Sequence, residues 1–356
     1  MGHESRRILA NRIKKPPAPL WSWEFFCQNH GDIMSCILMF IIIGFMFGLT
    51  NPISSVFVLP QYNETIISPI DNITTEVVYS YGLYDIPNFL FYTIFWITIH
   101  ALIQEYIFDK VQRRNHLSRT SMSKFFESGH LVTFFAYSAI HSLVLLYENN
   151  YINNPSQMWI DYPKNHKKIG LNMKMFYLLQ ISYWLHQFPC FLFQRIKRDE
   201  MATRGVYSMA YLILIMASYY MNFTKSAVLL MFLQYFVLTF YHYGRVSLLL
   251  GKRNRASISF ALYNLTFILT KFFSVSVIIF TFGSGLESHR HDEIEEGNYN
   301  TSTIRFIILL IMTSMQIFQV MKFFMKIMAI YFDSYDKDKG TLDEDDSNEE
   351  GRAKRE

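Results

Sequence analysis

The chain has 356 residues, of which 51% are hydrophobic and 17% charged, and its formal net charge is +4. Its three cysteines, Cys27, Cys36 and Cys190, show no CxxC spacing and lie in or beside apolar runs, which argues against a disulfide framework or a zinc site. So small a net charge says little about partners, and no nucleic-acid partner is predicted.

Apolar runs close to the ~20 residues that cross a ~30 Å hydrocarbon core recur along the chain, which predicts an all-α, polytopic membrane protein. About thirty residues precede the first run, which is long for a cleaved signal peptide, so the first run is interpreted as a retained signal anchor. Eight spans are predicted, with six as the main alternative because only a few residues join spans five and six. The predicted spans are residues 32–50, 86–107, 129–147, 171–194, 205–221, 226–250, 257–283 and 303–331.

Basic residues indicate the orientation of these spans. Lys and Arg are concentrated in loops 108–128, 195–204 and 251–256, whereas loop 51–85 has none. The positive-inside rule then predicts an even number of spans with both termini in the cytosol. Three Asn-x-Ser/Thr sequons, at Asn63, Asn72 and Asn300, fall in predicted non-cytosolic loops and are candidate glycosylation sites.

Four regions are expected. Residues 1–31 form a cytosolic N-terminal segment, and residues 32–107 form the first two spans with a glycosylated lumenal loop between them. Residues 108–331 form a six-helix domain. Residues 332–356 are rich in Asp and Glu and are predicted to be a disordered cytosolic tail.

Polar residues within the predicted spans are the candidate functional groups. An ionisable group at the centre of a membrane helix costs roughly 2.5–3.5 kcal/mol, so a polar pocket between helices is the default interpretation. Helical periodicity and topology place several of them in the cytosolic halves of spans two, four and six, which predicts a hydrated groove open to the cytosol. The predicted groove, as a contact for substrate or lipid, consists of His100, Gln104, Tyr183, His186, Gln234, Tyr241, His242, Arg245 and Lys271.

These groups also have simpler interpretations. The sole role of any single Gln or Tyr could be a hydrogen bond to a neighbouring helix, which contributes about 0.6 kcal/mol to stability. Arg245 could snorkel to the interface. Lys271 lies too close to the middle of span seven to snorkel easily. Span eight contributes two further polar side chains, Gln316 and Gln319. If Lys271 is an unpaired buried cation, its replacement by Leu should preserve or increase stability.

The segment 289–293 contains His289, His291, Asp292 and Glu293, which are potential metal ligands. It lies in a predicted soluble loop beside further glutamates, so a solvated acidic loop is expected. No metal site and no cofactor are predicted.

Several motifs together resemble the translocating chain-associated membrane protein (TRAM) family. They are residues 28–33 (QNHGDI), 100–106 (HALIQEY), 123–129 (SKFFESG), 183–186 (YWLH) and 188–189 (FP), and the likeness runs from about residue 17 to about residue 330. The resemblance implies a TLC-type helical bundle, the fold shared with ceramide synthases, in the endoplasmic reticulum membrane. It further implies association with the Sec translocon and assistance to signal sequences and transmembrane segments.

Two positions depart from the family pattern. The family tends to carry an acidic residue after Pro189 and another at position 238, where this chain has Cys190 and Leu238. Both changes remove possible partners of Arg245 or Lys271.

A lipid enzyme of the ceramide synthase type and a lipid transporter or scramblase are the alternatives. The enzyme chemistry of that family depends on an adjacent pair of histidines, and no two histidines are adjacent in this sequence. No inverted repeat is visible, which disfavours a transporter. The chain is therefore predicted to be a non-enzyme whose partners are the Sec translocon, nascent chains and phospholipid, with the ribosome as a further partner of the basic loops.

Overall fold

The computed structural model describes residues 19, 22–67, 75–117, 119–194, 196, 198–289 and 297–353. The chain forms two compact units. Unit 1 comprises residues 1–130 and 168–220, and unit 2 comprises residues 131–167 and 221–356. The expected boundary between residues 107 and 108 does not coincide with this division, because helices distant in sequence pair within each unit.

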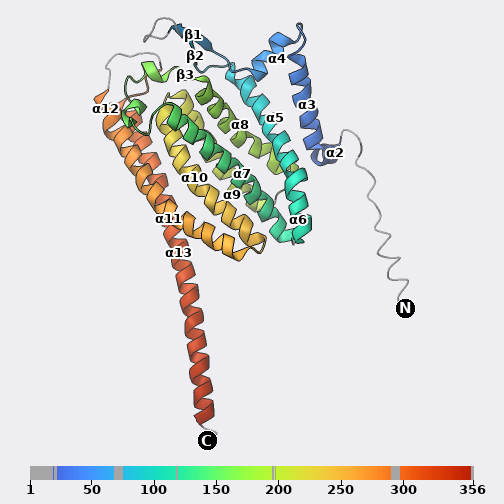
Figure 1. Ribbon diagram of the computed structural model, residues 1–356, viewed down its shortest axis with the longest axis vertical. Helices are drawn as coiled ribbons and strands as arrows, with labels where there is room; N and C mark the ends of the chain where they lie inside the picture. Colours follow the sequence, from blue (N-terminus) through green and yellow to red (C-terminus); the bar gives the residue numbers. More distant parts are fainter. Residues whose placement is uncertain are drawn as a thin grey trace. The chain divides into compact units, whose positions relative to one another are not determined.

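Helices account for most of the described chain (Figure 1). Short antiparallel strands and short 3₁₀ turns lie between some of them. The helices are α2 (Trp23–Gln28), α3 (His30–Gly44), α4 (Asn51–Val58), α5 (Asp85–Ile103), α6 (Asp109–Asn115), α7 (Arg119–Glu148), α8 (Leu171–Phe193), α9 (Arg198–Tyr220), α10 (Thr224–Leu249), α11 (Arg253–Ile278), α12 (Leu286–Ser288) and α13 (Ser302–Ala353), and the strands are β1 (Asn63–Ile67), β2 (Thr75–Tyr79) and β3 (Ile169–Gly170).

The predicted fold class, a polytopic helical membrane protein, is confirmed. Among the described residues, 6 helical stretches are long and apolar enough to cross a membrane, and a helix lies in each of the eight predicted ranges. The count of eight spans is not confirmed, because α3 has only 15 residues and α8 carries several polar side chains. The six stretches are Asp85–Asn115, Ser121–Glu148, Glu200–Tyr220, Thr224–Leu249, Arg253–Ser288 and Ser302–Ala329.

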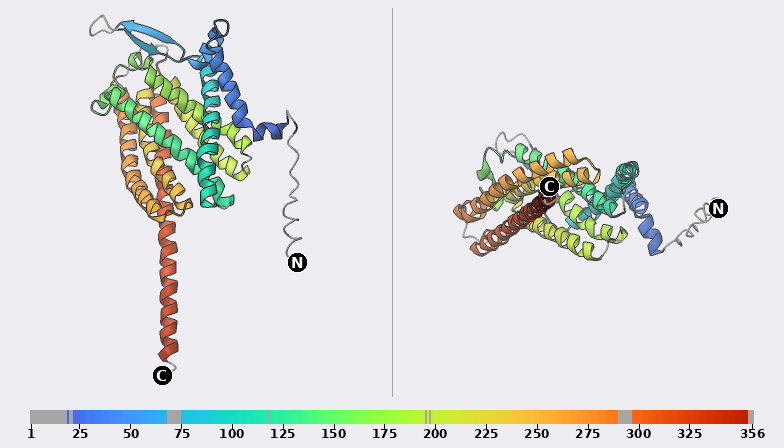
Figure 2. Two further views of the ribbon diagram at one scale, coloured as in Figure 1. Left: turned by 45° about the vertical axis from the view of Figure 1, so that its right-hand side comes forward. Right: turned by 90° about the horizontal axis from the view of Figure 1, so that it is seen from below.

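In unit 1, the strands form a small sheet in the order β1-β2-β3. Figure 2 draws the antiparallel hairpin of β1 and β2 as arrows. Val78 of β2 pairs with Gly170 of β3, so the loop before α5 is joined to the loop before α8. Each of these helices begins within a few residues of its strand, and the sheet therefore fixes where both of them start.

Helix α8 forms the core of unit 1. Phe176, Tyr177, Leu178 and Ile181 are fully buried, at 0% exposure, as expected for a helix that is covered on all sides. Side chains also tie α8 to α5, since the Trp96 indole nitrogen donates to the Leu179 carbonyl at 3.0 Å.

In unit 2, helices α10 and α11 form a hairpin that packs closely at Gly244. A Cβ atom at this position would lie 2.9 Å from the Phe260 ring, so a larger residue would push the helices apart. Helix α11 also packs on α13, where the rings of Phe267 and Phe323 stack with their centroids 4.3 Å apart.

Helix α13 continues to Ala353, through the segment that was expected to be a disordered tail. Extension of an existing helix needs no new nucleus, so a polar sequence can follow an apolar helix in the same conformation. The side chains after Ala329 lie outside the described part of the structure.

Candidate functional site

The nine predicted groove residues separate into two groups, one in each unit. His100, Gln104, Tyr183 and His186 belong to unit 1, and the remaining five belong to unit 2. Each group is built by neighbouring helices of its own unit, so the candidate site consists of two polar clusters.

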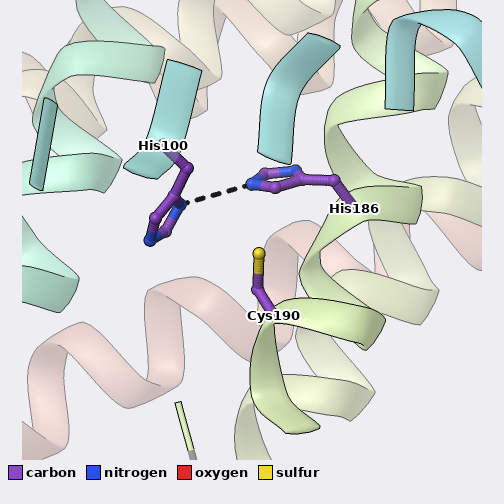
Figure 3. A group of neighbouring side chains, drawn as sticks. All are labelled: His100, His186 and Cys190. Atoms are coloured by element: carbon purple, nitrogen blue, oxygen red, sulfur yellow. Dashed lines mark hydrogen bonds between the residues drawn. The ribbon is translucent and has the colours of Figure 1, made fainter. Parts of the chain in front are cut away.

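The first, which we call the histidine cluster, contains His100, His130, His186 and Cys190. His100 Nδ1, on α5, lies 3.4 Å from His186 Nε2, on α8, and the Cys190 thiol points toward the pair (Figure 3). His186 is fully buried, and its Nδ1 donates a hydrogen bond to the Tyr183 carbonyl, which can only accept. His186 therefore carries its proton on Nδ1.

His130 was missed by the sequence interpretation, although it is a central part of this cluster. Its ring stacks on His100 with centroids 3.5 Å apart, and its Nε2 lies 3.1 Å from Gln104 Oε1. Gln104 also donates to Asp109 at 2.8 Å. Gln104 begins a π-helical turn, Gln104–Phe108, a feature that is frequent at functional sites.

Tyr183 lines the same region as an aromatic wall. It is 3% exposed, and its ring lies 4.7 Å from His186 and 5.2 Å from Trp96, centroid to centroid. These ring contacts restrict the position of the His186 imidazole.

The second, which we call the glutamine cluster, surrounds Lys271 in unit 2. The ammonium donates to the amide oxygens of Gln234, Gln316 and Gln319 at 2.7, 3.0 and 2.5 Å. Lys271 is 5% exposed. An ammonium has three N–H donors, so this set of acceptors satisfies it without a carboxylate.

The expectation that Lys271 is an unpaired buried cation is therefore wrong. Helical periodicity shows which residues share a face of one helix. It does not show that glutamines on α10 and α13 converge on one atom of α11. The amide oxygens, and no carboxylate, are the hydrogen-bond acceptors that the structure gives the Lys271 ammonium.

The other groove residues of unit 2 lie together on α10. The Arg245 guanidinium sits over the Tyr241 ring at 5.8 Å from its centroid, and the Lys326 ammonium sits over the same ring at 4.9 Å. His242 is buried at 7% exposure and packs on Phe135, with ring centroids 5.4 Å apart. Two cations thus lie near the Tyr241 ring, and cation–π attraction stabilises this arrangement.

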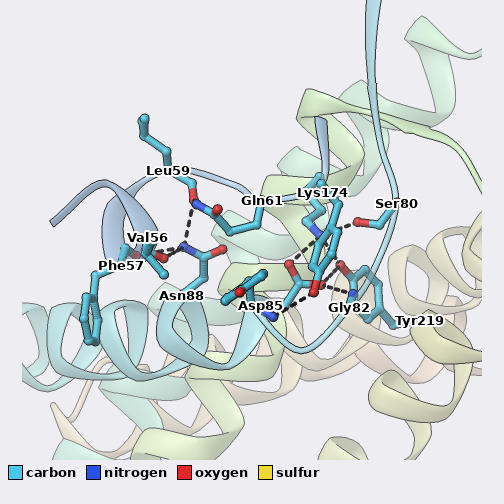
Figure 4. A network of polar contacts seen from close by, with 12 residues as sticks. Val56, Phe57, Leu59, Gln61, Ser80, Gly82, Asp85, Asn88, Lys174 and Tyr219 are labelled. Atoms are coloured by element: carbon cyan, nitrogen blue, oxygen red, sulfur yellow. Dashed lines mark hydrogen bonds and ion pairs between the residues drawn. The ribbon is translucent and has the colours of Figure 1, made fainter. Parts of the chain in front are cut away.

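A buried ion pair in unit 1 had no counterpart in the sequence interpretation. The Lys174 ammonium contacts Asp85 at 2.7 Å, the Ser80 carbonyl at 2.7 Å and the Tyr219 hydroxyl at 2.6 Å (Figure 4). The Tyr219 hydroxyl in turn donates to Asp85 at 2.8 Å. The sequence analysis identified neither Lys174 nor Asp85, because nothing in either segment alone indicates their pairing.

The candidate glycosylation sites differ in accessibility. Asn63 is exposed on β1, and Asn72 lies outside the described residues. Asn300 is only 4% exposed; its amide nitrogen donates to the Leu286 carbonyl at 2.7 Å and its amide oxygen accepts from Arg305. A glycan on Asn300 would have to break these contacts, so the geometry argues against this site.

Cys190 lies in the histidine cluster of unit 1. From the family pattern, an acidic residue at this position was expected to be a possible partner of Arg245 or Lys271, but the neighbours of Cys190 are His100 and His186. Its thiol and the two imidazoles of His100 and His186 have the donor chemistry of a metal site. Of the segment 289–293, which contains other potential metal ligands, only His289 lies within the described residues, and its Nδ1 lies 3.0 Å from the Gly285 carbonyl.

Comparison with known proteins decides the family. The chain is 35% identical over 318 residues to human "Translocating chain-associated membrane protein 2", which covers 88% of this chain and 84% of that protein. The mouse protein of the same name is 33% identical over 317 residues, with the same coverage of both chains. This chain belongs to the TRAM family.

The TLC domain of this TRAM-family chain is also recognised directly, because residues 124–325 match the model named TRAM_LAG1_CLN8. A more distant likeness leads to an enzyme: "Sphingosine N-acyltransferase lac1" of Schizosaccharomyces pombe is 26% identical over 195 residues, which is 54% of this chain and 48% of that protein. The domain therefore occurs in proteins with different activities.

Proposed function

We propose that this chain assists secretory and membrane proteins at the Sec translocon of the endoplasmic reticulum membrane. The observation that carries the proposal is the likeness to translocating chain-associated proteins over 88% of the chain. The signal sequences and transmembrane segments of nascent chains are the proposed substrates.

The polar clusters supply a mechanism. The glutamine cluster places one ammonium and three amide groups between the helices of unit 2, in surroundings that are otherwise apolar. Polar groups at this depth hydrate and thin the adjacent bilayer, so the charged flank of a nascent segment crosses less hydrocarbon. Each buried charge that is avoided is worth roughly 2.5–3.5 kcal/mol, which matters most for weakly hydrophobic segments.

Phospholipid is the second proposed partner, and the ribosome the third. Lys252, just before α11, and Arg253 and Arg255, in its first turn, are exposed, so they can meet anionic lipid or ribosomal RNA phosphates.

The test is reconstitution of microsomes that have been depleted of this protein. The informative variant is the triple substitution Lys271→Leu, Gln234→Leu and Gln316→Leu, which removes three of the four polar side chains of the cluster and leaves Gln319, and Lys322→Leu on α13 is the matched control. We expect the triple variant to reduce translocation of weakly hydrophobic signal sequences several-fold and to leave strongly hydrophobic ones unchanged. Equal rescue by the triple variant and the wild type would exclude the polar mechanism, and absence of photo-crosslinks between nascent signal sequences and the wild type would exclude the function.

Lipid handling is the alternative function, and the likeness to lac1 favours it. An acyltransferase needs a general base at the reacting hydroxyl or amine, and this sequence has no adjacent histidines. We therefore expect no acyl-CoA-dependent acylation of sphingoid bases by the purified protein. Turnover that disappears in His186→Ala or His242→Ala would establish the enzyme instead, and lipid flux in proteoliposomes would establish the carrier.

A further inference from the structure

We propose that His100, His186 and Cys190 bind a zinc ion within unit 1. The ligand atoms of these three residues lie within 4.8 Å of one another, and two imidazoles with one thiolate are a donor set that zinc prefers. The site is independent of the proposed role at the translocon.

The distance between the imidazoles fits a pair of metal ligands. Two nitrogens bound to a tetrahedral zinc at about 2.0–2.1 Å are roughly 3.3 Å apart. The observed separation of His100 Nδ1 and His186 Nε2 is 3.4 Å, longer than most N–H hydrogen bonds, which span about 2.7–3.2 Å. The Cys190 sulfur has to approach by about 1.2 Å at most to complete the triangle.

The other nitrogen of each imidazole already has the kind of partner that orients a metal ligand. His186 Nδ1 donates to the Tyr183 carbonyl, which leaves the Nε2 lone pair free to face His100 and Cys190. His100 Nε2 lies 2.7 Å from the Gln194 side-chain amide, whose oxygen can accept from it after the amide turns. Metal-bound histidines characteristically make such outer hydrogen bonds, which fix the tautomer and the ring orientation.

The backbone positions also suit a shared ion. His186 and Cys190 are four residues apart on α8 and so lie on one face of the helix, opposite His100 on α5. The bound ion would tie α5 to α8 and leave one coordination position for a water molecule. Binding deprotonates the Cys190 thiol, and the proton leaves to solvent.

A metal-free hydrogen-bonded chain is the competing explanation. In it, His186 donates to Tyr183, His100 donates to His186, and the Gln194 amide donates to His100. This arrangement satisfies the neutral imidazoles but gives no role to the thiol, so the thiol is where the two explanations differ.

The test measures zinc in the full-length protein, purified in detergent without a histidine tag. We expect about one zinc per chain, reduced at least about tenfold in Cys190→Ala. The matched control is Cys27→Ala, because Cys27 is also buried and packs in the same apolar cluster as Cys190. Zinc content should be unchanged in this control.

Cobalt substitution separates loss of a ligand from loss of the fold. The Co²⁺ form of the wild type should show a thiolate-to-cobalt charge-transfer band. Cys190→Asp, which replaces one anionic ligand with another, should keep metal and lose the band. Wild-type protein without zinc, or Cys190→Ala protein with as much zinc as Cys27→Ala protein, would establish the metal-free chain.

Discussion

Lys271 shows how a buried cation can be stabilised without a counter-ion. Each of its three N–H donors has an amide oxygen within 3.0 Å. Replacement by Leu would remove the donors and leave these acceptors in a buried cluster, and an unsatisfied buried polar group costs about 1–3 kcal/mol. We therefore expect Lys271→Leu to lower the thermal denaturation midpoint in detergent.

The matched comparison uses the glutamines themselves. Removing both sides of a hydrogen bond is close to neutral, so Gln234→Leu and Gln316→Leu added to Lys271→Leu should recover much of the lost stability. A single Lys271→Leu variant as stable as the wild type would show that water replaces the ammonium, and the cluster would then have no structural role.

His166 makes unit 2 sensitive to acid. It lies in the loop between α7 and α8, is 2% exposed, and donates to the Ile160 carbonyl at 3.2 Å. Burial and, to a smaller extent, the nearby Lys225 ammonium lower the pKa of His166 to about 3.

The sign of the pH dependence follows from this shift. The unfolded chain takes up a proton near pH 6.5, whereas the folded chain does so only near the folded pKa of about 3. The contribution of His166 to stability is thus complete above pH 6.5 and is lost as the pH falls toward 3, by about 1.4 kcal/mol per pH unit. We expect the denaturation midpoint of wild-type protein to fall more steeply below pH 6.5 than that of His166→Leu.

The control is His116→Gln, because His116 is exposed in the loop after α6. This variant should follow the wild-type curve. Parallel curves for wild type and His166→Leu would mean that His166 does not remain neutral in the folded state.

At the level of elements, the Asp85–Lys174 pair joins the first turns of α5 and α8. Both side chains are fully buried, and Tyr219 extends the network to α9. Removal of one partner leaves an uncompensated buried charge, which costs about 3–5 kcal/mol. We expect Asp85→Ala to reduce the yield of folded protein severely, as measured by monodispersity on size-exclusion chromatography.

The double variant Asp85→Leu with Lys174→Met tests the cause. Apolar replacement of both partners is often neutral or stabilising, so this protein should be recovered in folded form. Equal loss in the single and double variants would assign the defect to the geometry of the helix start instead of to the charge.

The sequence predicted the helices well, because an apolar run of span length has few alternatives. It predicted no strands, since the segments Asn63–Ile67 and Thr75–Tyr79 are short and each is stabilised by pairing with another part of the chain. Among the site residues, helical periodicity found His100, His186 and Lys271. It did not find that His130 and Cys190 are neighbours of His100 and His186. Contacts between helices depend on how the helices pack, and the pattern within one helix does not encode this.

At the scale of the whole chain, contacts between loops show which loops lie on the same side of each unit. The sheet of unit 1 joins the loop before α5 to the loop before α8. In unit 2, the Tyr162 hydroxyl donates to the Met221 carbonyl at 2.8 Å and accepts from the Tyr299 backbone at 3.2 Å, which joins the loop after α7 to the loops before α10 and before α13. Both sets agree with the predicted topology, in which all these loops are lumenal.

This topology can be tested by glycosylation of the chain in microsomes. Endoglycosidase should change the mobility of the wild type, and Asn63→Gln with Asn72→Gln should abolish most of that change, because Asn63 is exposed on β1. Asn300→Gln should leave the glycan unchanged, since the Asn300 amide nitrogen is held by the Leu286 carbonyl. A protease added from the cytosolic side should remove a C-terminal tag; a protected tag would contradict the even number of spans, and a glycan that depends on Asn300 would show that the loop before α13 opens in the native protein.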